Sequence, residues 1–382
     1  MNAATNLYAR LKIPRVINAA GTLTSLGGCR TRPEVLQAMT QAAGEFVPLA
    51  ELHQKAGDHL AAVLGVEAAM VTAGAAAGLT LAAAACMAGR DPLIAAGIRS
   101  RLPQPPANCK VVIQCSHRNP FERALQLAGA TLLQIGDAIR TYPVDLETVL
   151  KESGGEIAAV VFFLQAEMLE ASLSLNETLE IAHAYQVPVI VDAAAELPPK
   201  KNLWSLAQGG SDMVIFSGSK DLRGPQTSGL MVGQRDWIAS ALRQSAPHED
   251  VIGRPLKAGK EIVAGMLAAV ELYLAEDEKI RFAEWERIAK YIEDNLGDVP
   301  YLRVSRYTPQ QPYIQPAVVP RVTVALDDEA PLSTLVLKTA LWKGEPSIAT
   351  ETIGGRLILN THTLEMPEAE LIVRQIKKAL SS

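Results

Sequence analysis

Short apolar runs alternate along the first part of the chain with stretches of helical character, such as residues 122–128 and 175–185. Strands that are apolar along their whole length are typical of parallel sheets covered by helices on both faces. We therefore expect an α/β fold built on a mostly parallel, doubly wound sheet of about seven strands. The last strand follows its predecessor after a short turn and is expected to be antiparallel. The strands are predicted at residues 68–72, 110–115, 131–135, 158–164, 187–191, 213–216 and 229–232.

The pattern changes towards the C-terminus. A helical region runs from Pro255 to about Leu296, and short strands at 301–305, 322–325 and 356–359 precede a terminal helix at 368–380. Four prolines, at positions 309, 312, 316 and 320, mark a loop-rich stretch among them. This predicts a smaller α+β C-terminal domain. The expected division is an N-terminal segment at 1–50, a large domain at 51–250, and a small domain at 251–382 that includes the long linking helix.

Composition narrows the class of protein. The 382 residues exceed what one hydrophobic core usually holds, and 48% hydrophobic content with 20% charged residues supports a sizeable core. The net charge is -5 without a long basic cluster, so we expect no nucleic-acid partner. The chain begins without a signal-peptide core, and glycines interrupt the alanine-rich run 73–88, so we expect a cytoplasmic protein with no membrane partner. Its four cysteines lack metal-binding spacing, so we expect reduced thiols and no metal site.

One lysine stands between an apolar strand and a Gly-Pro turn, in the run Ser217-Gly-Ser-Lys220-Asp-Leu-Arg-Gly224-Pro225-Gln226. An amine held at a strand end can be desolvated and directed at a carbonyl, as a Schiff-base lysine requires. Upstream, a second buried strand ends at Asp192. Asp192 alone could be a helix cap, and Lys220 alone could be solvated. Together they supply a carboxylate for a pyridinium nitrogen and an amine for an aldehyde, which predicts a site for pyridoxal 5'-phosphate.

Other candidates follow strands at the edge where ligands bind such sheets. The small residues Gly74, Ala75 and Ala76 open a helix and let backbone N–H groups approach a phosphate, although close helix packing would also explain them. His117 could stack on an aromatic ring or supply a proton, or it could be a capping or core histidine. Gln165 could donate to a ring oxygen or simply satisfy its own loop.

The ordered motifs resemble one superfamily over nearly the full length of the chain. They resemble the fold-type-I pyridoxal phosphate enzymes, and within them the branch of bacterial selenocysteine synthases and D-glucosaminate-6-phosphate ammonia-lyases. The matching segments are Arg15-Val-Ile-Asn-Ala-Ala-Gly21-Thr22, Glu51-Leu-His53-Gln-Lys-Ala-Gly57, His117-Arg118-Asn119, Ser217-Gly-Ser-Lys220, Gly224-Pro225-Gln226, Gly253-Arg254-Pro-Leu-Lys257-Ala-Gly-Lys260-Glu261 and Gly355-Arg356-Leu.

The resemblance implies a role for several side chains. It implies that Lys220 binds the cofactor aldehyde, that Asp192 pairs with the pyridinium nitrogen, and that His117 stacks on the ring. It also implies that Arg356, in the small domain, binds the substrate carboxylate. Selenocysteine synthases carry a further N-terminal region that binds tRNA, and we expect no such role here because the acidic balance gives no phosphate-binding surface.

The phosphate loop departs from the resembled pattern. The lyases usually have serines where this chain has Ala73, Ala75 and Ala77. Phosphate binding is therefore expected to depend on the backbone amides of residues 74–76, together with Ser217 and Ser219.

The expected reaction is an α,β-elimination by a lyase that converts a hydroxylated amino acid into a 2-keto acid and ammonia. Lys220 is the natural general base once the substrate has displaced it. A racemase or epimerase, an aminotransferase, and a non-catalytic paralogue that only binds ligands are alternatives. Basic residues favour the lyase, because a phosphorylated sugar acid would suit the cluster Arg254, Lys257 and Lys260, with Arg99 and Arg101; a solvated basic helix start is the alternative.

We also expect a homodimer or larger homo-oligomer with sites at the subunit interface. A polar loop is expected at 49–55, before the large-domain sheet, without an obvious partner in its own subunit. Its residues Glu51 and His53 are expected to contact substrate in the partner's pocket, as the resemblance implies. The apolar flank formed by Ile262, Met266, Leu267 and Val270 would then be buried against the second subunit. Alternatively this flank packs on its own large domain, and Glu51 and His53 are solvated residues at the start of a helix.

Overall fold

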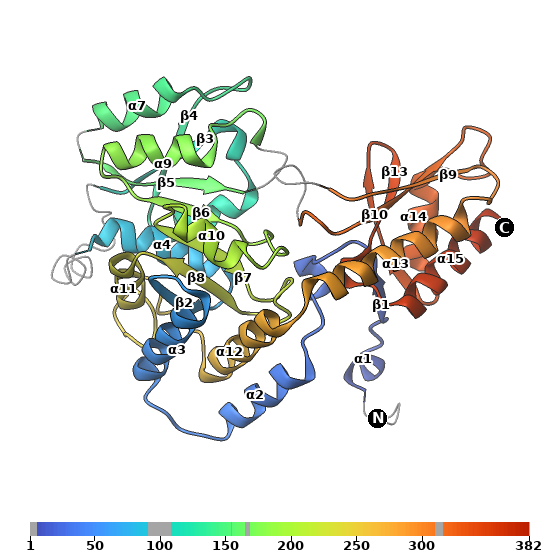
Figure 1. Ribbon diagram of the computed structural model, residues 1–382, viewed down its shortest axis with the longest axis horizontal. Coiled ribbons are helices and arrows are strands. Elements are labelled where there is room, and N and C mark those ends of the chain that lie inside the picture. The colour runs from blue at the N-terminus through green and yellow to red at the C-terminus, as the bar shows by residue number, and fades with distance from the viewer. Residues whose placement is uncertain (1–5, 91–107, 154, 165–168, 310–315, 382) are drawn as a thin grey trace. The chain divides into compact units, whose positions relative to one another are not determined.

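A computed structural model describes residues 6–90, 108–153, 155–164, 169–309 and 316–381. The chain forms two compact units, counting only the described residues of each segment (Figure 1). The larger contains Thr31–Glu276, and the smaller contains Met1–Arg30, Asp277–Gln310 and Val318–Ser382. The three-part division at residues 50 and 250 stays a prediction, because compactness does not show which segments fold independently.

A 7-stranded sheet forms the centre of the larger unit's described part, in the order β2-β8-β7-β6-β5-β3-β4. β8 is antiparallel to both of its neighbours, and the other pairs are parallel. This confirms the predicted mostly parallel sheet and its antiparallel last strand. The strands are β2 (Ala68–Thr72), β3 (Lys110–Gln114), β4 (Thr131–Ile135), β5 (Ile157–Phe163), β6 (Val189–Asp192), β7 (Met213–Ser217) and β8 (Gly229–Gly233).

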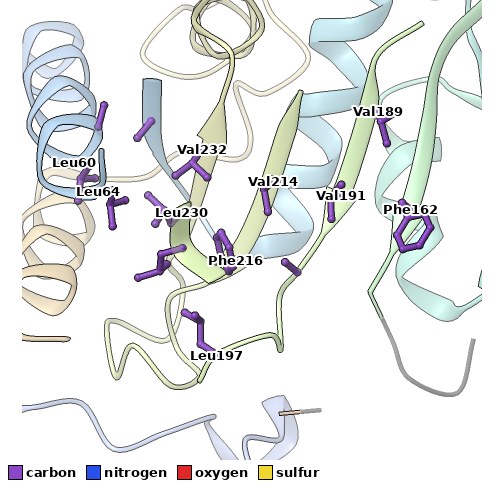
Figure 2. Packing of buried hydrophobic residues seen from close by; sticks show 14 of the residues in the cluster. Leu60, Leu64, Phe162, Val189, Val191, Leu197, Val214, Phe216, Leu230 and Val232 are labelled. Atoms are coloured by element: carbon purple, nitrogen blue, oxygen red, sulfur yellow. The ribbon is translucent and has the colours of Figure 1, made fainter. Parts of the chain in front are cut away.

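The sheet is apolar throughout because both of its faces are covered. Along β5, Val160 and Phe162 join one hydrophobic cluster, whereas Val161 and Phe163 join the other. Figure 2 shows the first cluster, with side chains from β5 to β8 and from the helix that carries Leu60. Since side chains alternate between the faces of a strand, each strand needs apolar residues at every position.

The helices of the larger unit complete these two layers. The first cluster includes residues of α3 and α12, and the second includes residues of α4 and α11. The predicted helices at 122–128 and 175–185 correspond to α6 and α9. The helices are α2 (Pro33–Ala43), α3 (Leu49–Leu64), α4 (Ala75–Ala88), α6 (Arg123–Leu127), α7 (Pro143–Glu152), α9 (Leu175–Ala184), α10 (Asn202–Gln208), α11 (Arg235–Arg243) and α12 (Lys260–Ala275), with short 3-10 turns η4 (Cys115–His117) and η5 (Pro120–Glu122).

The helical region predicted from Pro255 to about Leu296 is present from Lys260 onwards, but not as the single long linking helix that was expected. Two helices, α12 and α13 (Glu278–Leu296), are separated at Glu276 and Asp277. Lys200 Nζ donates to the carbonyls of Leu274, at 3.0 Å, and Glu276, while the Asp277 side chain accepts from the N–H of Lys279 and caps α13. These contacts satisfy some of the backbone groups that the two helix ends leave without intrahelical partners, and they stabilise the break.

The smaller unit contains a 4-stranded antiparallel sheet, in the order β12-β13-β10-β9, and a parallel pair β1-β11, within the described residues. Its core includes residues of α13, α14 and α15. The three strands and terminal helix predicted here are present as β9, β10, β13 and α15, whereas β1, β11 and β12 were not predicted. The elements are α1 (Leu7–Arg10), β1 (Val16–Asn18), η2 (Thr24–Leu26), β9 (Leu302–Tyr307), β10 (Arg321–Leu326), α14 (Thr334–Lys343), β11 (Ser347–Ala349), β12 (Glu351–Ile353), β13 (Arg356–Asn360), η6 (Thr361–Thr363) and α15 (Met366–Leu380).

Candidate active site

The candidate site lies where parallel strands of the larger unit end. β2, β6 and β7 run in the same direction, because β8 is antiparallel to both β2 and β7 and β6 is parallel to β7. Their carboxyl ends therefore share one edge of the sheet. This edge carries Thr72 at the end of β2, Asp192 at the end of β6 and Ser217 at the end of β7. It is the edge at which α/β sheets bind ligands.

Asp192 is the last residue of β6 and is buried, with 8% exposure. The N–H of Ala194 donates to its Oδ1 at 2.9 Å. Burial raises the pKa of Asp192, whereas the Ala194 hydrogen bond and the positive charge of Lys220 lower it. A buried carboxylate with one backbone partner has acceptor capacity left for a cationic ring N–H.

Lys220 is held in a tight loop that follows β7. Gly218 donates from its N–H to the carbonyl of Ser228 at 2.9 Å, and Gly224 donates to the carbonyl of Gly218 at 2.8 Å. A Cβ at Gly218 would lie 2.1 Å from the Oγ of Ser228, so the loop closes only around a glycine. The Ser217 and Ser219 hydroxyls lie 3.3 Å apart in the same turn. The amine is thus carried by a rigid segment beside the end of β6.

The start of α4 suits an anion. Gly74 takes φ of 106° and lets the chain turn directly from β2 into the helix, whose first turn contains no acidic residue. β8 approaches this turn so closely that a Cβ at Gly229 would lie 2.7 Å from the carbonyl carbon of Gly74 and 3.0 Å from the N of Ala75. The first N–H groups of a helix lack intrahelical acceptors and point towards a bound anion, so residues 74–76 could hold a phosphate.

His117 is fully buried after β3, and its ring meets Phe162 edge-on at 4.6 Å between centroids. Burial lowers the pKa of His117 to about 4, so the ring is neutral near pH 7. The N–H of Phe163 donates to Nδ1 at 3.3 Å, which leaves the proton on Nε2. Among the described residues Nε2 has no acceptor, so a buried donor is available to a bound group.

These three features fit pyridoxal phosphate. The helix start offers N–H groups to its phosphate, Asp192 offers a buried carboxylate to its ring nitrogen, and Lys220 offers an amine to its aldehyde. His117 adds an imidazole N–H beside them. The assignment of these roles remains a proposal.

The other predicted residues lie elsewhere or outside the described residues. Gln165, Arg99 and Arg101 are outside them. Arg356 belongs to the smaller unit, where it is exposed at the start of β13. Arg254 and Lys257 are exposed and precede α12, whereas Lys260 begins it and donates to the carbonyl of Ala43 at 3.1 Å.

Segment 49–55 is the start of α3 and not a loop. Glu51 forms an exposed ion pair with Lys55 at 2.7 Å, and its pKa is lowered by that partner. His53 is 5% exposed and its Nε2 contacts the Ala258 carbonyl at 3.1 Å, so the alternative of a solvated His53 was wrong.

The apolar flank of α12 packs within its own unit. Met266 and Val270 are buried in the first hydrophobic cluster, and Ile262 and Leu267 pack against it. Met266 and Val270 are therefore covered within their own unit, as the alternative predicted, and Ile262 and Leu267 are partly covered there.

One polar pair beside the site was not predicted. Asp221, next to Lys220 and fully buried, accepts a hydrogen bond from the Tyr273 hydroxyl at 2.5 Å. The aspartate is visible in the sequence, but its partner stands on α12. No local pattern indicates that the two meet.

Comparisons with known proteins define the class. A solved D-glucosaminate-6-phosphate ammonia-lyase superposes with a TM-score of 0.81 at 28% identity and covers 99% of each chain. Other solved pyridoxal phosphate enzymes are similar to this chain only in their fold. The fold is that of the fold-type-I pyridoxal phosphate enzymes, which supports pyridoxal phosphate as the cofactor.

Within that class, the chain belongs to the family of L-seryl-tRNA selenium transferase (SelA), whose model matches residues 16–288. It is 31% identical over 296 residues to a D-glucosaminate-6-phosphate ammonia lyase of Salmonella typhimurium (strain 14028s / SGSC 2262), covering 75% of each chain. It is 32% identical over 385 residues to a 5'-C-glycyluridine monooxygenase-decarboxylase of a Streptomyces species, covering 98% of this chain and 92% of the relative. The predicted resemblance is thereby confirmed.

Proposed function

We propose that the protein is a pyridoxal phosphate-dependent ammonia-lyase that acts on a hydroxylated amino acid, in particular one derived from a phosphorylated sugar. The observation that carries the proposal is the buried carboxylate of Asp192 at the end of β6, beside the strand β7 that leads into the Lys220 loop, at the edge of the sheet where α4 also begins. The likeness to the ammonia-lyases in sequence and structure supports the reaction class.

The chain's own groups divide the work. Bound pyridoxal phosphate would act as an electron sink for an attached amino acid. Asp192 would accept the ring N–H and keep that nitrogen protonated, and the N–H groups of residues 74–76, with Ser217 and Ser219, would bind the phosphate. Lys220 Nζ, once released from the aldehyde, would take the proton from the substrate α-carbon.

The overall reaction balances without another reagent. The hydroxyl on carbon three leaves as water after the α-proton is removed, and hydrolysis of the resulting imine consumes one water. The products are a 2-keto acid and ammonia. Arg356, Arg254, Lys257 and Glu51 are proposed to contact the carboxylate and distal groups of the substrate.

A decarboxylating oxidation is a second candidate, favoured by the Streptomyces relative that spans nearly the whole chain. Oxygen uptake and carbon dioxide release distinguish it from elimination, which consumes no oxygen. Racemisation or epimerisation would release no ammonia, and transamination would convert the cofactor to its amine form. A non-catalytic paralogue would bind ligands without turnover.

The test is an assay of ammonia and 2-keto acid with a panel of 3-hydroxy amino acids that includes D-glucosaminate 6-phosphate. We expect equal amounts of both products, no oxygen uptake, and no activity in Lys220→Ala. Lys290→Ala, which removes an exposed lysine of α13, is the matched control and should retain activity. Failure to form keto acid and ammonia with any member of the panel would contradict the proposal.

We further propose that the active unit is at least a homodimer. Phe46 is fully exposed between α2 and α3, its neighbour Val47 and Leu36 on α2 are also exposed, and a second subunit would cover these apolar side chains. The expected cytoplasmic location stays a prediction. Among the described residues no helix is long and apolar enough to cross a membrane.

A further inference from the structure

A second pocket lies in the larger unit, between the start of α3 and the segment that follows α11. Its volume is about 250 Å³, and its lining includes Ala50, His53, Leu242, Arg243 and His248. Arg243 takes no part in the proposed reaction.

The topology brings this pocket to the edge of the sheet that carries Lys220. α3 ends at Leu64, shortly before β2 begins, and the chain turns back there, so the two elements run in opposite directions. The first turn of α3 therefore lies about one helix length, roughly 24 Å, from Leu64, on the side where β2 ends. α11 begins at Arg235, just after antiparallel β8 ends at Gly233, and returns towards the same edge at Arg243. The pocket therefore flanks edge strand β2 on the ligand-binding side.

His53 lines the pocket and carries a buried hydrogen-bond acceptor without a partner among the described residues. Its Nε2 must donate to the Ala258 carbonyl, because a carbonyl oxygen can only accept. Burial lowers the pKa of His53, so the ring is neutral near pH 7 and Nδ1 carries a lone pair without a proton. Nδ1 is buried and has no donor among the described residues, and leaving such a group unpaired costs about 1–3 kcal/mol.

Arg243 also lines the pocket and carries a complementary hydrogen-bond donor. Its Nη2 donates to the carbonyl of Arg90 at 3.2 Å, whereas its buried Nε–H has no acceptor in the part of the chain described. Two other polar residues of the lining are already engaged, since Gln54 donates to Asp58 and Ser245 donates to the Leu242 carbonyl, and His248 is exposed at the pocket. His53 and Arg243 thus each contribute one buried polar atom that has no partner among the described residues.

We propose that this pocket binds a hydroxylated organic anion, with an acid oxygen on Arg243 Nε and a hydroxyl that donates to His53 Nδ1. Sugar acids and sugar phosphates carry both groups in one molecule. An inorganic anion would satisfy Arg243 and a neutral polyol would satisfy His53. The site goes beyond the proposed reaction, because it requires neither Lys220 nor the cofactor.

The experiment measures binding of D-gluconate 6-phosphate, which has the hydroxyls and charges but no amine to react with the cofactor. Titration calorimetry compares the protein with His53→Gln and Arg243→Met. The terminal amide of a glutamine can still donate to Ala258 but provides no acceptor at the position of Nδ1. We expect each variant to weaken binding at least tenfold, and we expect inorganic phosphate to bind more weakly than the sugar phosphate.

Matched variants remove the same side chains elsewhere. His59→Gln, on the exposed side of α3, and Arg287→Met, on α13, should bind as the unchanged protein does. Thermal unfolding identifies a variant that has lost its fold, and Arg243→Lys then serves as the second test, because it keeps the charge but lacks Nε.

The variant Lys220→Ala tests whether the pocket is separate from the Lys220 centre. We expect Lys220→Ala to leave the affinity for gluconate 6-phosphate unchanged. A loss of affinity in Lys220→Ala would place the ligand at the Lys220 centre and would overturn the proposal. Unchanged affinity in folded His53→Gln and Arg243→Met would overturn it.

Discussion

The loop that carries Lys220 should not tolerate one added methyl group at Gly218. In Gly218→Ala the new Cβ would lie 2.1 Å from Ser228 Oγ and 2.7 Å from Met266 Sδ, and both neighbours belong to buried residues. Ser228 cannot turn away freely, because its hydroxyl donates to the Pro225 carbonyl at 2.7 Å. The loop or the helix behind it must therefore move.

The magnitude follows from two opposing effects. Overpacking by one methyl group in a packed core costs about 1–3 kcal/mol. Replacing glycine by alanine also stabilises by about 0.4–1 kcal/mol through the unfolded chain where the backbone conformation is compatible, and φ of Gly218 is not positive. We expect a net loss of about 1–2 kcal/mol in the free energy of unfolding, together with slower attachment of pyridoxal phosphate to Lys220.

Gly44→Ala is the matched control. Gly44 has φ of -75°, and a Cβ there would meet only the Gln41 carbonyl oxygen at an ordinary 3.6 Å. Urea unfolding should show equal or higher stability for Gly44→Ala and lower stability for Gly218→Ala. If Gly218→Ala matches the unchanged protein in both stability and cofactor attachment, the tight-loop description is refuted.

Three further predictions concern single groups and one concerns assembly. Asp192→Asn should lower turnover by about two to three orders of magnitude while the cofactor stays bound, since each unit of pKa at the ring nitrogen corresponds to about 1.4 kcal/mol. Steady-state kinetics measures this. Near-normal turnover would show that Asp192 serves only as the acceptor of the Ala194 N–H. The pKa of His117 is lowered from 6.5 to about 4, so as the pH falls the unfolded chain binds a proton at this residue before the folded chain does. The stability that the neutral, buried His117 provides is therefore lost between about pH 6.5 and pH 4. His117→Phe should therefore flatten the loss of stability over that range, measured by urea unfolding at several pH values, and an unchanged pH profile would contradict the burial argument. Arg356→Lys should raise the Michaelis constant with little effect on cofactor attachment, and an unchanged constant would remove its proposed role. Sedimentation at assay concentration should show at least a dimer. A fully active monomer would contradict the proposed subunit interface.

The large sheet could be predicted from the sequence because its strands are buried on both faces. Each strand reads as a continuous apolar run, so the position of β5 and the antiparallel turn before β8 were evident without any tertiary information. Asp192 and Lys220 could be proposed as candidates for the same reason, since Asp192 ends one such run and Lys220 follows another after the short segment 217–219.

Features that depend on distant segments could not be predicted. β1 has three residues and gains its order from pairing with β11, more than three hundred residues later. The break after α12 depends on Lys200, whose amine reaches the end of the helix from another segment. Likewise, His53 lies in a polar stretch that reads as solvated, and only its contact with Ala258 shows that it is buried.

The most direct test of the account is to find which residue bonds to the cofactor. The protein is loaded with pyridoxal phosphate, reduced with borohydride, digested, and analysed by mass spectrometry. The account predicts the added pyridoxyl mass on Lys220, and none in Lys220→Ala. A modification on another lysine, or a linkage that persists in Lys220→Ala, would contradict it.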